Sequence, residues 1–195
     1  MEKVRLGRTN REVTRLGWGG IPIQRISEDE AVGLVKAVIE MGVDLLDTAR
    51  GYSTSELRIG LALKRVKRRP VLSTKSFERS ARIYDDVLES LKTLDVGRID
   101  IYHLHDVSSM ADYEKVTAAD GAYEGLTRAR REGLIDHIGL SSHNLDVLER
   151  VVSDGLFDVV MTCYSFLEPD AATRIFPKAK AKDIGVMAMS PFLAG

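Results

Sequence analysis

The sequence predicts an α/β fold of the (β/α)8-barrel class, and three observations support this prediction. Short β-rich segments alternate with longer helical patterns along all 195 residues, which is typical of parallel βα units. Polar residues stand at the ends of several β-rich segments, where the loops of a barrel gather around its active site. No low-complexity linker or change in composition divides the chain, so we expect one domain over residues 1–195.

The first predicted element is a β-hairpin, in which Val4–Leu6 and Glu12–Thr14 flank the turn-like Gly7–Asn10. This hairpin would plug the closed end of the barrel. Seven parallel strands should follow, and we place them at Leu16–Gly19, Val43–Asp47, Val71–Lys75, Ile99–His105, His137–Ser141, Val159–Tyr164 and Val186–Met189.

Helical patterns occupy the segments between these strands. In the first one, apolar residues recur at three- and four-residue spacing between Ala31 and Ile39, which predicts one apolar face. Ser27 with Glu30 has the pattern of a capping box, and Gly42 is a stop signal. The predicted helices are Glu28–Met41, Ser55–Lys67, Tyr84–Leu94, Tyr123–Arg131, Leu145–Ser153 and Ala171–Lys182, and residues 107–120 are the least regular stretch.

Only seven strands are visible, whereas a closed barrel of this class has eight strands and about 250 residues. The first and seventh strands would then keep unpaired edges, because only closure of a sheet removes them. We therefore expect an incomplete barrel: either the sequence is a fragment of a longer protein, or another chain or an oligomer covers the gap. The open edges of the sheet would allow self-association into a homo-oligomer.

Composition excludes several classes of partner. The 28 Lys and Arg balance 29 Asp and Glu, so no overall field attracts nucleic acid or an anionic membrane. The basic run Lys64–Arg69 closes a predicted helix at the barrel end away from chemistry, where we expect it to be solvated. Cys163 is the only cysteine, which excludes a disulfide and a cysteine-rich metal cage. Without a signal-like or membrane-spanning apolar stretch, a cytoplasmic location is expected.

Four residues near successive strand ends form the candidate catalytic set: Asp47, Tyr52, Lys75 and His105. A barrel would bring them to one mouth, where a phenol, an ammonium, a carboxylate and an imidazole could handle the proton of a carbonyl reduction. The pKa of a free phenol, about 10, suits neutral pH poorly, and we expect Lys75 to lower the pKa of Tyr52. Asp47 would orient Lys75, and His105 would bind the substrate oxygen. His103, one layer deeper on the same strand face, is expected to be a core histidine.

The motifs around these residues resemble those of the aldo-keto reductases. The segments concerned are Asp47–Tyr52 with Ser55-Glu56, Ser73–Lys75, Asp100–Asp106, Ile138–Asn144 and Met189–Gly195, which follow one another in the family's order along the whole chain. The resemblance implies a (β/α)8 barrel that reduces aldehydes, ketones or sugar-like carbonyls with hydride from NADP(H), with Tyr52 as proton donor.

The resemblance also implies the residues that hold the cofactor. Ser141 and Ser142 would hold the nicotinamide carboxamide, and Ser190, Phe192 and Leu193 belong to the loop over the pyrophosphate. Trp18 and Met161 complete this set, although many family members have Asn at position 142 and Gln at position 161. The surroundings of Met161 resemble a microbial branch that often carries a C-terminal iron–sulfur segment.

Two other functions remain open at this point. The same fold could serve as a nicotinamide-binding regulatory or scaffold protein without turnover, because fold alone does not decide function. More remotely, His103-Leu104-His105 with nearby carboxylates resembles the metal site of a hydrolase barrel. A hydrolase site, however, would leave Tyr52 and Lys75 without a role, and we expect no metal.

Overall fold

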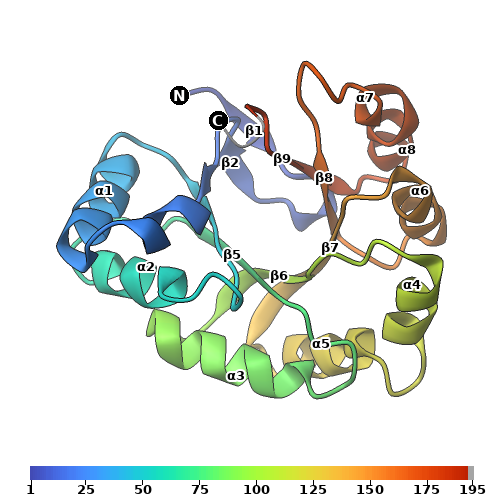
Figure 1. Cartoon of the computed structure of the whole chain (residues 1–195), viewed down its shortest axis with the longest axis horizontal. Helices are drawn as coiled ribbons and strands as arrows, with labels where there is room; N and C mark the ends of the chain where they lie inside the picture. The colour runs from blue at the N-terminus through green and yellow to red at the C-terminus, as the bar shows by residue number, and fades with distance from the viewer. Residues whose placement is uncertain (193–195) are drawn as a thin grey trace.

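The computed structural model describes residues 1–192 and shows a curled parallel sheet surrounded by helices (Figure 1). The strands pair in sequence order from β3 to β9, as the alternating pattern predicts. Their bounds are β3 (Trp18–Gly19), β4 (Leu45–Asp47), β5 (Val71–Ser76), β6 (Ile99–Leu104), β7 (Ile135–Ser142), β8 (Val159–Cys163) and β9 (Gly185–Met189).

The helices lie on the outer face of the sheet and bury their apolar sides against it (Figure 1). The first of them begins at the predicted capping box, in which Ser27 and Glu30 bond each other's backbone amides. The helices are α1 (Glu28–Glu40), α2 (Ser55–Leu63), α3 (Ile83–Leu94), α4 (Met110–Thr117), α5 (Ala122–Arg131), α6 (Leu145–Asp154), α7 (Ala171–Arg174) and α8 (Phe176–Ala181), with a 3-10 turn, η2 (Ile21–Arg25), before α1.

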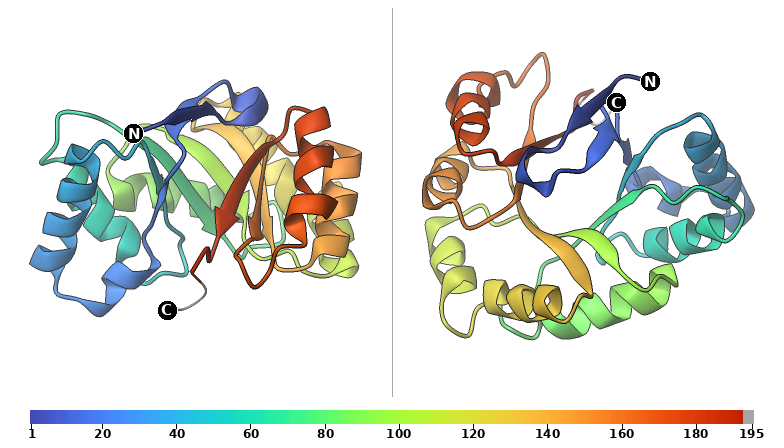
Figure 2. Two further views of the ribbon diagram at one scale, coloured as in Figure 1. Left: turned by 90° about the horizontal axis from the view of Figure 1, so that it is seen from above. Right: turned by 180° about the vertical axis from the view of Figure 1, so that it is seen from behind.

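The predicted hairpin is present and closes one end of the barrel. Strands β1 (Lys3–Arg5) and β2 (Glu12–Thr14) pair antiparallel on either side of the 3-10 turn η1 (Gly7–Thr9). Leu6 and Val13 are buried in a small interior cluster with residues of the barrel strands. The hairpin and the carboxyl end of β9 lie at opposite ends of the molecule (Figure 2). The hairpin therefore acts as the expected plug, and the other end stays free for chemistry.

Three local predictions differ from the structure. Strand β3 is only two residues long. The stretch expected to be irregular contains α4, whose first turn is capped by the Ser109 hydroxyl accepting from the Asp112 amide at 3.0 Å. The single helix predicted over Ala171–Lys182 is broken at Ile175, because Pro177 has no amide hydrogen and can stand only in the first turn of a new helix.

Strands β3 and β9 each have one hydrogen-bonded neighbour in the part of the chain described, so the sheet has two open edges as predicted. Side chains along each strand alternate between the barrel interior and the helical layer. The interior layer contains Leu45, Ile101, Val159, Met161 and Met187, so Asp47, Lys75 and His105 follow them on the same face. Among residues 1–192, the structure contains no helix with the length and apolar character needed to cross a membrane.

Candidate active site at the carboxyl ends of the strands

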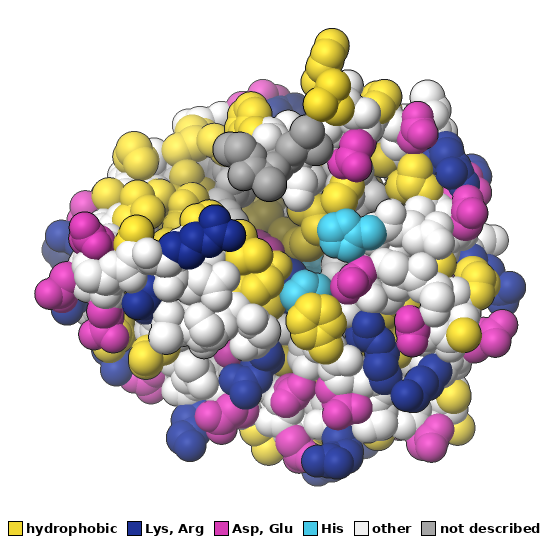
Figure 3. Space-filling view, in the orientation of Figure 1, with side chains coloured by type: hydrophobic (Ala, Val, Ile, Leu, Met, Phe, Trp, Pro, Cys, Tyr) yellow, Lys and Arg dark blue, Asp and Glu magenta, His cyan; other side chains and the backbone are white. Residues whose placement is uncertain are grey.

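The four predicted catalytic residues line one cavity. Asp47 ends β4, Lys75 lies near the end of β5, His105 directly follows β6, and Tyr52 stands in the loop after β4. The cavity has a volume of about 620 Å³ and runs from these residues along the interior to the hairpin. Figure 3 looks into this hollow, with histidine side chains at its rim and hydrophobic side chains around it.

Lys75 is the buried centre of the site. Its side chain is 2% exposed, and its ammonium donates to Asp47 Oδ2 at 2.5 Å and to the Thr48 carbonyl at 2.8 Å. Asp47 also accepts from the Ser73 hydroxyl at 2.7 Å, which fixes the carboxylate. A buried charge needs such partners, because an unpaired ammonium in this place would cost several kcal/mol. The pair therefore places a fixed positive charge beneath the loop that carries Tyr52.

The Tyr52 ring lies against both Lys75 and His105. Lys75 Nζ is 5.1 Å from the ring centroid, and the imidazole of His105 meets the ring edge-on with centroids 5.7 Å apart. Burial raises the pKa of Tyr52 above its ordinary value of 10, while the charge of Lys75 lowers it. The net direction is upward, so our expectation of a lowered pKa was wrong: the lysine acts as expected, but loss of hydration outweighs it.

His105 is held as a neutral imidazole. The side chain is 9% exposed, and burial together with the charge of Lys75 lowers the pKa of His105 to about 3. Its Nδ1 is buried and has no hydrogen-bond partner among the described residues. A proton on that nitrogen would be an unsatisfied buried donor, so the proton belongs on Nε2. His105 therefore offers the cavity one N–H donor.

His103 is a core residue, as its position one layer deeper predicts. It is fully buried, and burial followed by the charge of Lys75 lowers its pKa well below the ordinary 6.5. Neither ring nitrogen has a partner within the described residues. The ring fits only because residue 139 is glycine, since a Cβ there would lie 2.2 Å from His103 Nδ1. No cluster of three or more His, Cys, Asp or Glu that could hold a metal ion occurs in residues 1–192, so the hydrolase reading gains no support.

Five of the seven predicted cofactor residues line the cavity: Trp18, Ser141, Met161, Ser190 and Phe192. Ser142 does not, because it is fully buried and its hydroxyl accepts from the Asn144 amide at 3.0 Å. Neighbouring residues of a strand point to opposite faces, so Ser141 and Ser142 cannot both face the cavity. The seventh, Leu193, lies outside the described residues.

Two residues at the mouth were not predicted from the sequence. His143 lines the cavity, and its Nδ1 lies 3.3 Å from the Cys163 thiol. Phe77, in the loop after β5, stacks on His105 with ring centroids 3.9 Å apart. The motif Ile138–Asn144 contained a signal for His143, whereas Phe77 stands two residues past a matched motif and carried none.

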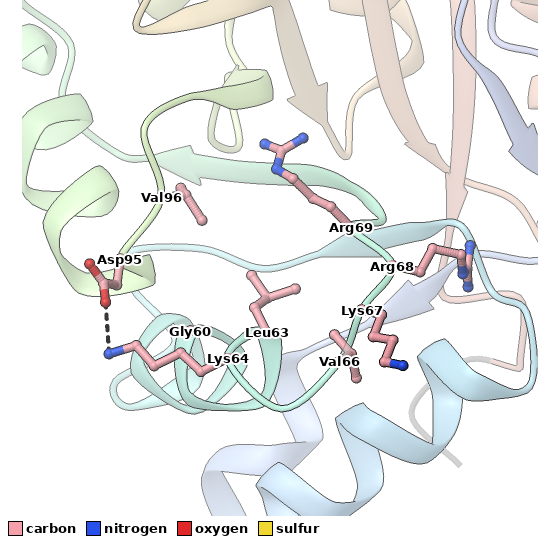
Figure 4. Close-up of a pocket in the computed structure, with 9 residues that line it drawn as sticks. All are labelled: Gly60, Leu63, Lys64, Val66, Lys67, Arg68, Arg69, Asp95 and Val96. Atoms are coloured by element: carbon pink, nitrogen blue, oxygen red, sulfur yellow. Dashed lines mark ion pairs between the residues drawn. The ribbon is translucent and has the colours of Figure 1, made fainter.

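The basic run Lys64–Arg69 lies at the opposite end of the barrel, as expected, beside a small pocket of about 220 Å³ (Figure 4). Its residues are more than solvated charges. Lys64 pairs with Asp95 at 2.7 Å, Arg69 pairs with Asp100 at 2.9 Å, and Arg68 pairs with Asp44 and donates to two backbone carbonyls. The arginines thus hold strand starts in place.

Comparison with known proteins gives a consistent result. The model of the aldo/keto reductase family matches residues 14–195. The chain is 28% identical over 210 residues to L-galactose dehydrogenase of Arabidopsis thaliana, covering 97% of this chain and 65% of that protein. It is 27% identical to a D-threo-aldose 1-dehydrogenase of a Pseudomonas species, covering 94% of this chain and 67% of that protein. The chain thus spans about two thirds of the length of these relatives.

Solved structures show the same fold. An aldo-keto reductase from Bacillus halodurans, solved in its holo form, superposes with a TM-score of 0.84 at 27% identity, covering 96% of this chain and 65% of that one. A thermostable aldo-keto reductase in complex with the inhibitor epalrestat superposes with a TM-score of 0.82 at 25% identity, covering 96% and 72%. The curled seven-stranded sheet matches the barrel of both proteins.

Proposed function

Because the chain belongs to the aldo/keto reductase family, we propose that its cavity reduces the carbonyl of an aldehyde, ketone or sugar-like substrate with hydride from NADP(H). The observation that supports this best is the buried Lys75–Asp47 pair under Tyr52, with the Nε2–H of His105 beside it. Two relatives are named as dehydrogenases of sugars, which favours a sugar-like substrate and a site that also works in the oxidative direction.

Tyr52 is the proposed proton donor. Its pKa is raised by burial, so the phenol keeps its proton throughout the neutral range. As negative charge develops on the substrate oxygen, the Lys75 ammonium stabilises the phenolate that remains after transfer. Asp47 holds the Lys75 ammonium in place through its bond at 2.5 Å. The raised pKa holds the donor in its acidic form, and the lysine makes its loss of a proton easier.

His105 is the proposed orienting group. Its Nε2–H would donate to the carbonyl oxygen and hold it near the Tyr52 hydroxyl. A neutral imidazole suits this role better than an imidazolium, which would add a second positive charge next to Lys75.

The cavity residues fit a nicotinamide cofactor. Trp18, Met161 and Met189 offer flat or pliable apolar surfaces, while Ser141, Ser190 and His143 offer polar groups for a carboxamide. When bound, the nicotinamide supplies hydride to the carbonyl carbon. The preference for NADP over NAD follows from the family resemblance.

The test is Tyr52→Phe, with Tyr123→Phe as matched control, because Tyr123 donates its hydroxyl to Leu156 O on the outer surface. Turnover with a panel of aldoses, ketones and aromatic aldehydes should fall at least about a thousandfold in Tyr52→Phe and stay unchanged in the control. NADPH affinity, measured by quenching of the single tryptophan, Trp18, should be the same in both. If Tyr52→Phe retained most of the rate, the mechanism would be wrong. In the wild-type chain, saturable NADPH binding without any turnover would favour the regulatory alternative.

A further inference from the structure

Phe77 has an unusual position for an exposed aromatic side chain. It stands one residue past β5 and is 52% exposed. One face of its ring covers the imidazole of His105, with centroids 3.9 Å apart and ring planes 18° from parallel. Single exposed apolar side chains are common on protein surfaces, but this one is spread over a proposed catalytic group.

The other contact of Phe77 ties it to the loop that carries Tyr52. A Cβ on residue 51 would lie 2.9 Å from Phe77 Cε2 and 3.4 Å from Cδ2, so only glycine leaves room for the ring. Tyr52, the next residue, meets His105 edge-on with planes 84° apart. Three rings from three successive βα loops therefore form a continuous contact: Phe77 on His105, and His105 on Tyr52.

We propose that Phe77 is a positioning residue for the carbonyl reduction, whose ring fixes the plane of His105 and keeps water off one face of the imidazole. The effect of Phe77 on the reaction rate rests on the proposed function. Its effect on the protonation of His105 does not.

Several charged and titratable groups surround the imidazole on which Phe77 stacks. His105 faces Lys75 from β5, Tyr52 from the loop after β4, Arg79 from the loop after β5, Asp106 from its own loop and His143 from the loop after β7. Burial is the main cause of its lowered pKa, ahead of Lys75. Removing the phenyl ring lets water reach the imidazole, so burial lowers the pKa of His105 less, while every neighbouring charge stays in place.

The experiment compares Phe77→Ala, Phe77→Leu and Phe77→Tyr in the full chain. Because half of the ring is exposed, these changes should not prevent folding. The ring signals of the four histidines are followed by NMR from pH 4 to 8, and His105 is assigned from its absence in His105→Asn. The wild-type ring, whose pKa is lowered to about 3, should stay neutral over this range. We expect Phe77→Ala to raise the pKa of His105 by at least one unit, so that the ring begins to titrate at the acid end of the range, Phe77→Leu to raise the pKa less, and Phe77→Tyr to leave it unchanged. Phe166→Leu is the control, since Phe166 is 95% exposed and does not line the cavity.

The second readout is kinetic. In Phe77→Ala, kcat should fall about tenfold to a hundredfold with little change in KM, because a mispositioned donor weakens the transition state more than the bound substrate. Its pH–rate profile should show the ionisation of His105 at a higher pH than in the wild type, and Phe77→Tyr should restore the wild-type profile. An unchanged His105 titration in Phe77→Ala would overturn the proposal. That result is independent of Tyr52→Phe, whose retained turnover would instead overturn the proposed function.

Discussion

At the amino-terminal end of the barrel, an aspartate at the start of each of five strands pairs with a basic side chain. In the cavity at the carboxyl-terminal end, by contrast, one buried pair, Lys75–Asp47, lies near two imidazoles with unpartnered nitrogens, His103 and His105. The amino-terminal pairs are Lys3–Asp44 at 2.8 Å, Arg69–Asp100 at 2.9 Å, Arg11–Asp136 at 2.5 Å, Arg130–Asp158 at 3.4 Å and Arg5–Asp183 at 2.5 Å. Three of the basic residues come from the hairpin, so the pairs fasten the plug to the strands.

At the carboxyl-terminal end, the same residue types are arranged differently. Lys75–Asp47 is the only ion pair among the described residues that line the cavity, and His105 leaves one nitrogen unsatisfied. Ser53 and Asp106, which directly follow Tyr52 and His105, adopt left-handed backbone conformations, but so do Asn10, Asp95 and Asp183 at the other end, so the unsatisfied nitrogen is the feature that sets the cavity apart. Such features cost stability and are retained where function requires them. The comparison predicts that the amino-terminal end determines stability and the carboxyl-terminal end determines activity.

The sharpest contrast compares Lys75→Met with Asp100→Ala. Lys75→Met leaves the Asp47 carboxylate largely buried without its partner, and should lower the free energy of unfolding by about 3–5 kcal/mol. Asp100→Ala removes a buried carboxylate whose arginine partners, Arg69 and Arg11, stay partly hydrated, and should cost about 1–3 kcal/mol. Asp100→Ala also leaves the Leu72 amide without its acceptor. Lys75→Met should abolish carbonyl reduction, while the folded fraction of Asp100→Ala keeps its turnover. Urea unfolding and steady-state kinetics check both, and equal loss of turnover in the two variants would contradict the division between the ends.

The two regions should also respond to acid in different pH ranges. His103 and His105 have lowered pKa values, so their contribution to stability is complete above the unfolded value of 6.5 and is lost as the pH falls. Below pH 6, each should cost about 1.4 kcal/mol per pH unit. Asp158 also has a lowered pKa. Because it is a carboxyl group, its contribution to stability is complete above its ordinary pKa of 3.8 and is lost only as the pH falls below that value.

Urea unfolding at pH 7, 6 and 5 therefore reports mainly on the imidazoles, because the carboxyl groups with lowered pKa values contribute chiefly below pH 5. His103→Gln should roughly halve the slope of stability against pH between 6 and 5, because one of two buried imidazoles is gone. A slope that stays the same in this variant would show that His103 does not titrate with folding. A matched change at the other end, Asp158→Asn, should leave this slope intact and alter only the response below pH 4.

Much of this division could be predicted from the sequence. The polar residues at strand ends predicted the cavity. The capping box predicted the start of α1 and the turn-like segment predicted the β1–β2 hairpin, because each is a local pattern. The alternation along β7 also carried a signal that was not used: once Ser141 faces the cavity, Ser142 must face the helices. Likewise, Ser109 with Asp112, and Tyr113 with Val116 at three-residue spacing, indicated α4.

Other features depend on how distant segments meet, which no local pattern determines. The stack of Phe77 on His105 follows from the register of β5 and β6, in which Ser76 pairs with Leu104 and the two aromatic residues come next, and the ring also lies against a glycine in the loop after β4. The net direction of the Tyr52 pKa shift depends on how deeply the ring is buried, and sequence neighbours do not reveal this. The spacing of charged groups along the chain thus identifies candidate site residues. Whether loss of hydration or a neighbouring charge has the larger effect on their pKa values depends on how deeply they are buried.

The smallest predicted effect concerns backbone strain next to Tyr52. Ser53 has φ of 40°, which is unfavourable for a residue with a Cβ by about 1–2 kcal/mol. Ser53→Gly and Ser53→Ala both lose the hydroxyl that donates to Gln24 Oε1 at 2.9 Å, so the difference between them isolates the backbone term. Ser53→Gly should be more stable than Ser53→Ala by about 1 kcal/mol, measured as the difference in free energy of unfolding. If the strain also holds Tyr52 in place, the more stable glycine variant should have the lower kcat, because a freer loop positions the phenol less well. Equal stability of the two variants would show that this end of the barrel stores no strain at Ser53, and the cost of function there would then lie in the unsatisfied imidazoles alone.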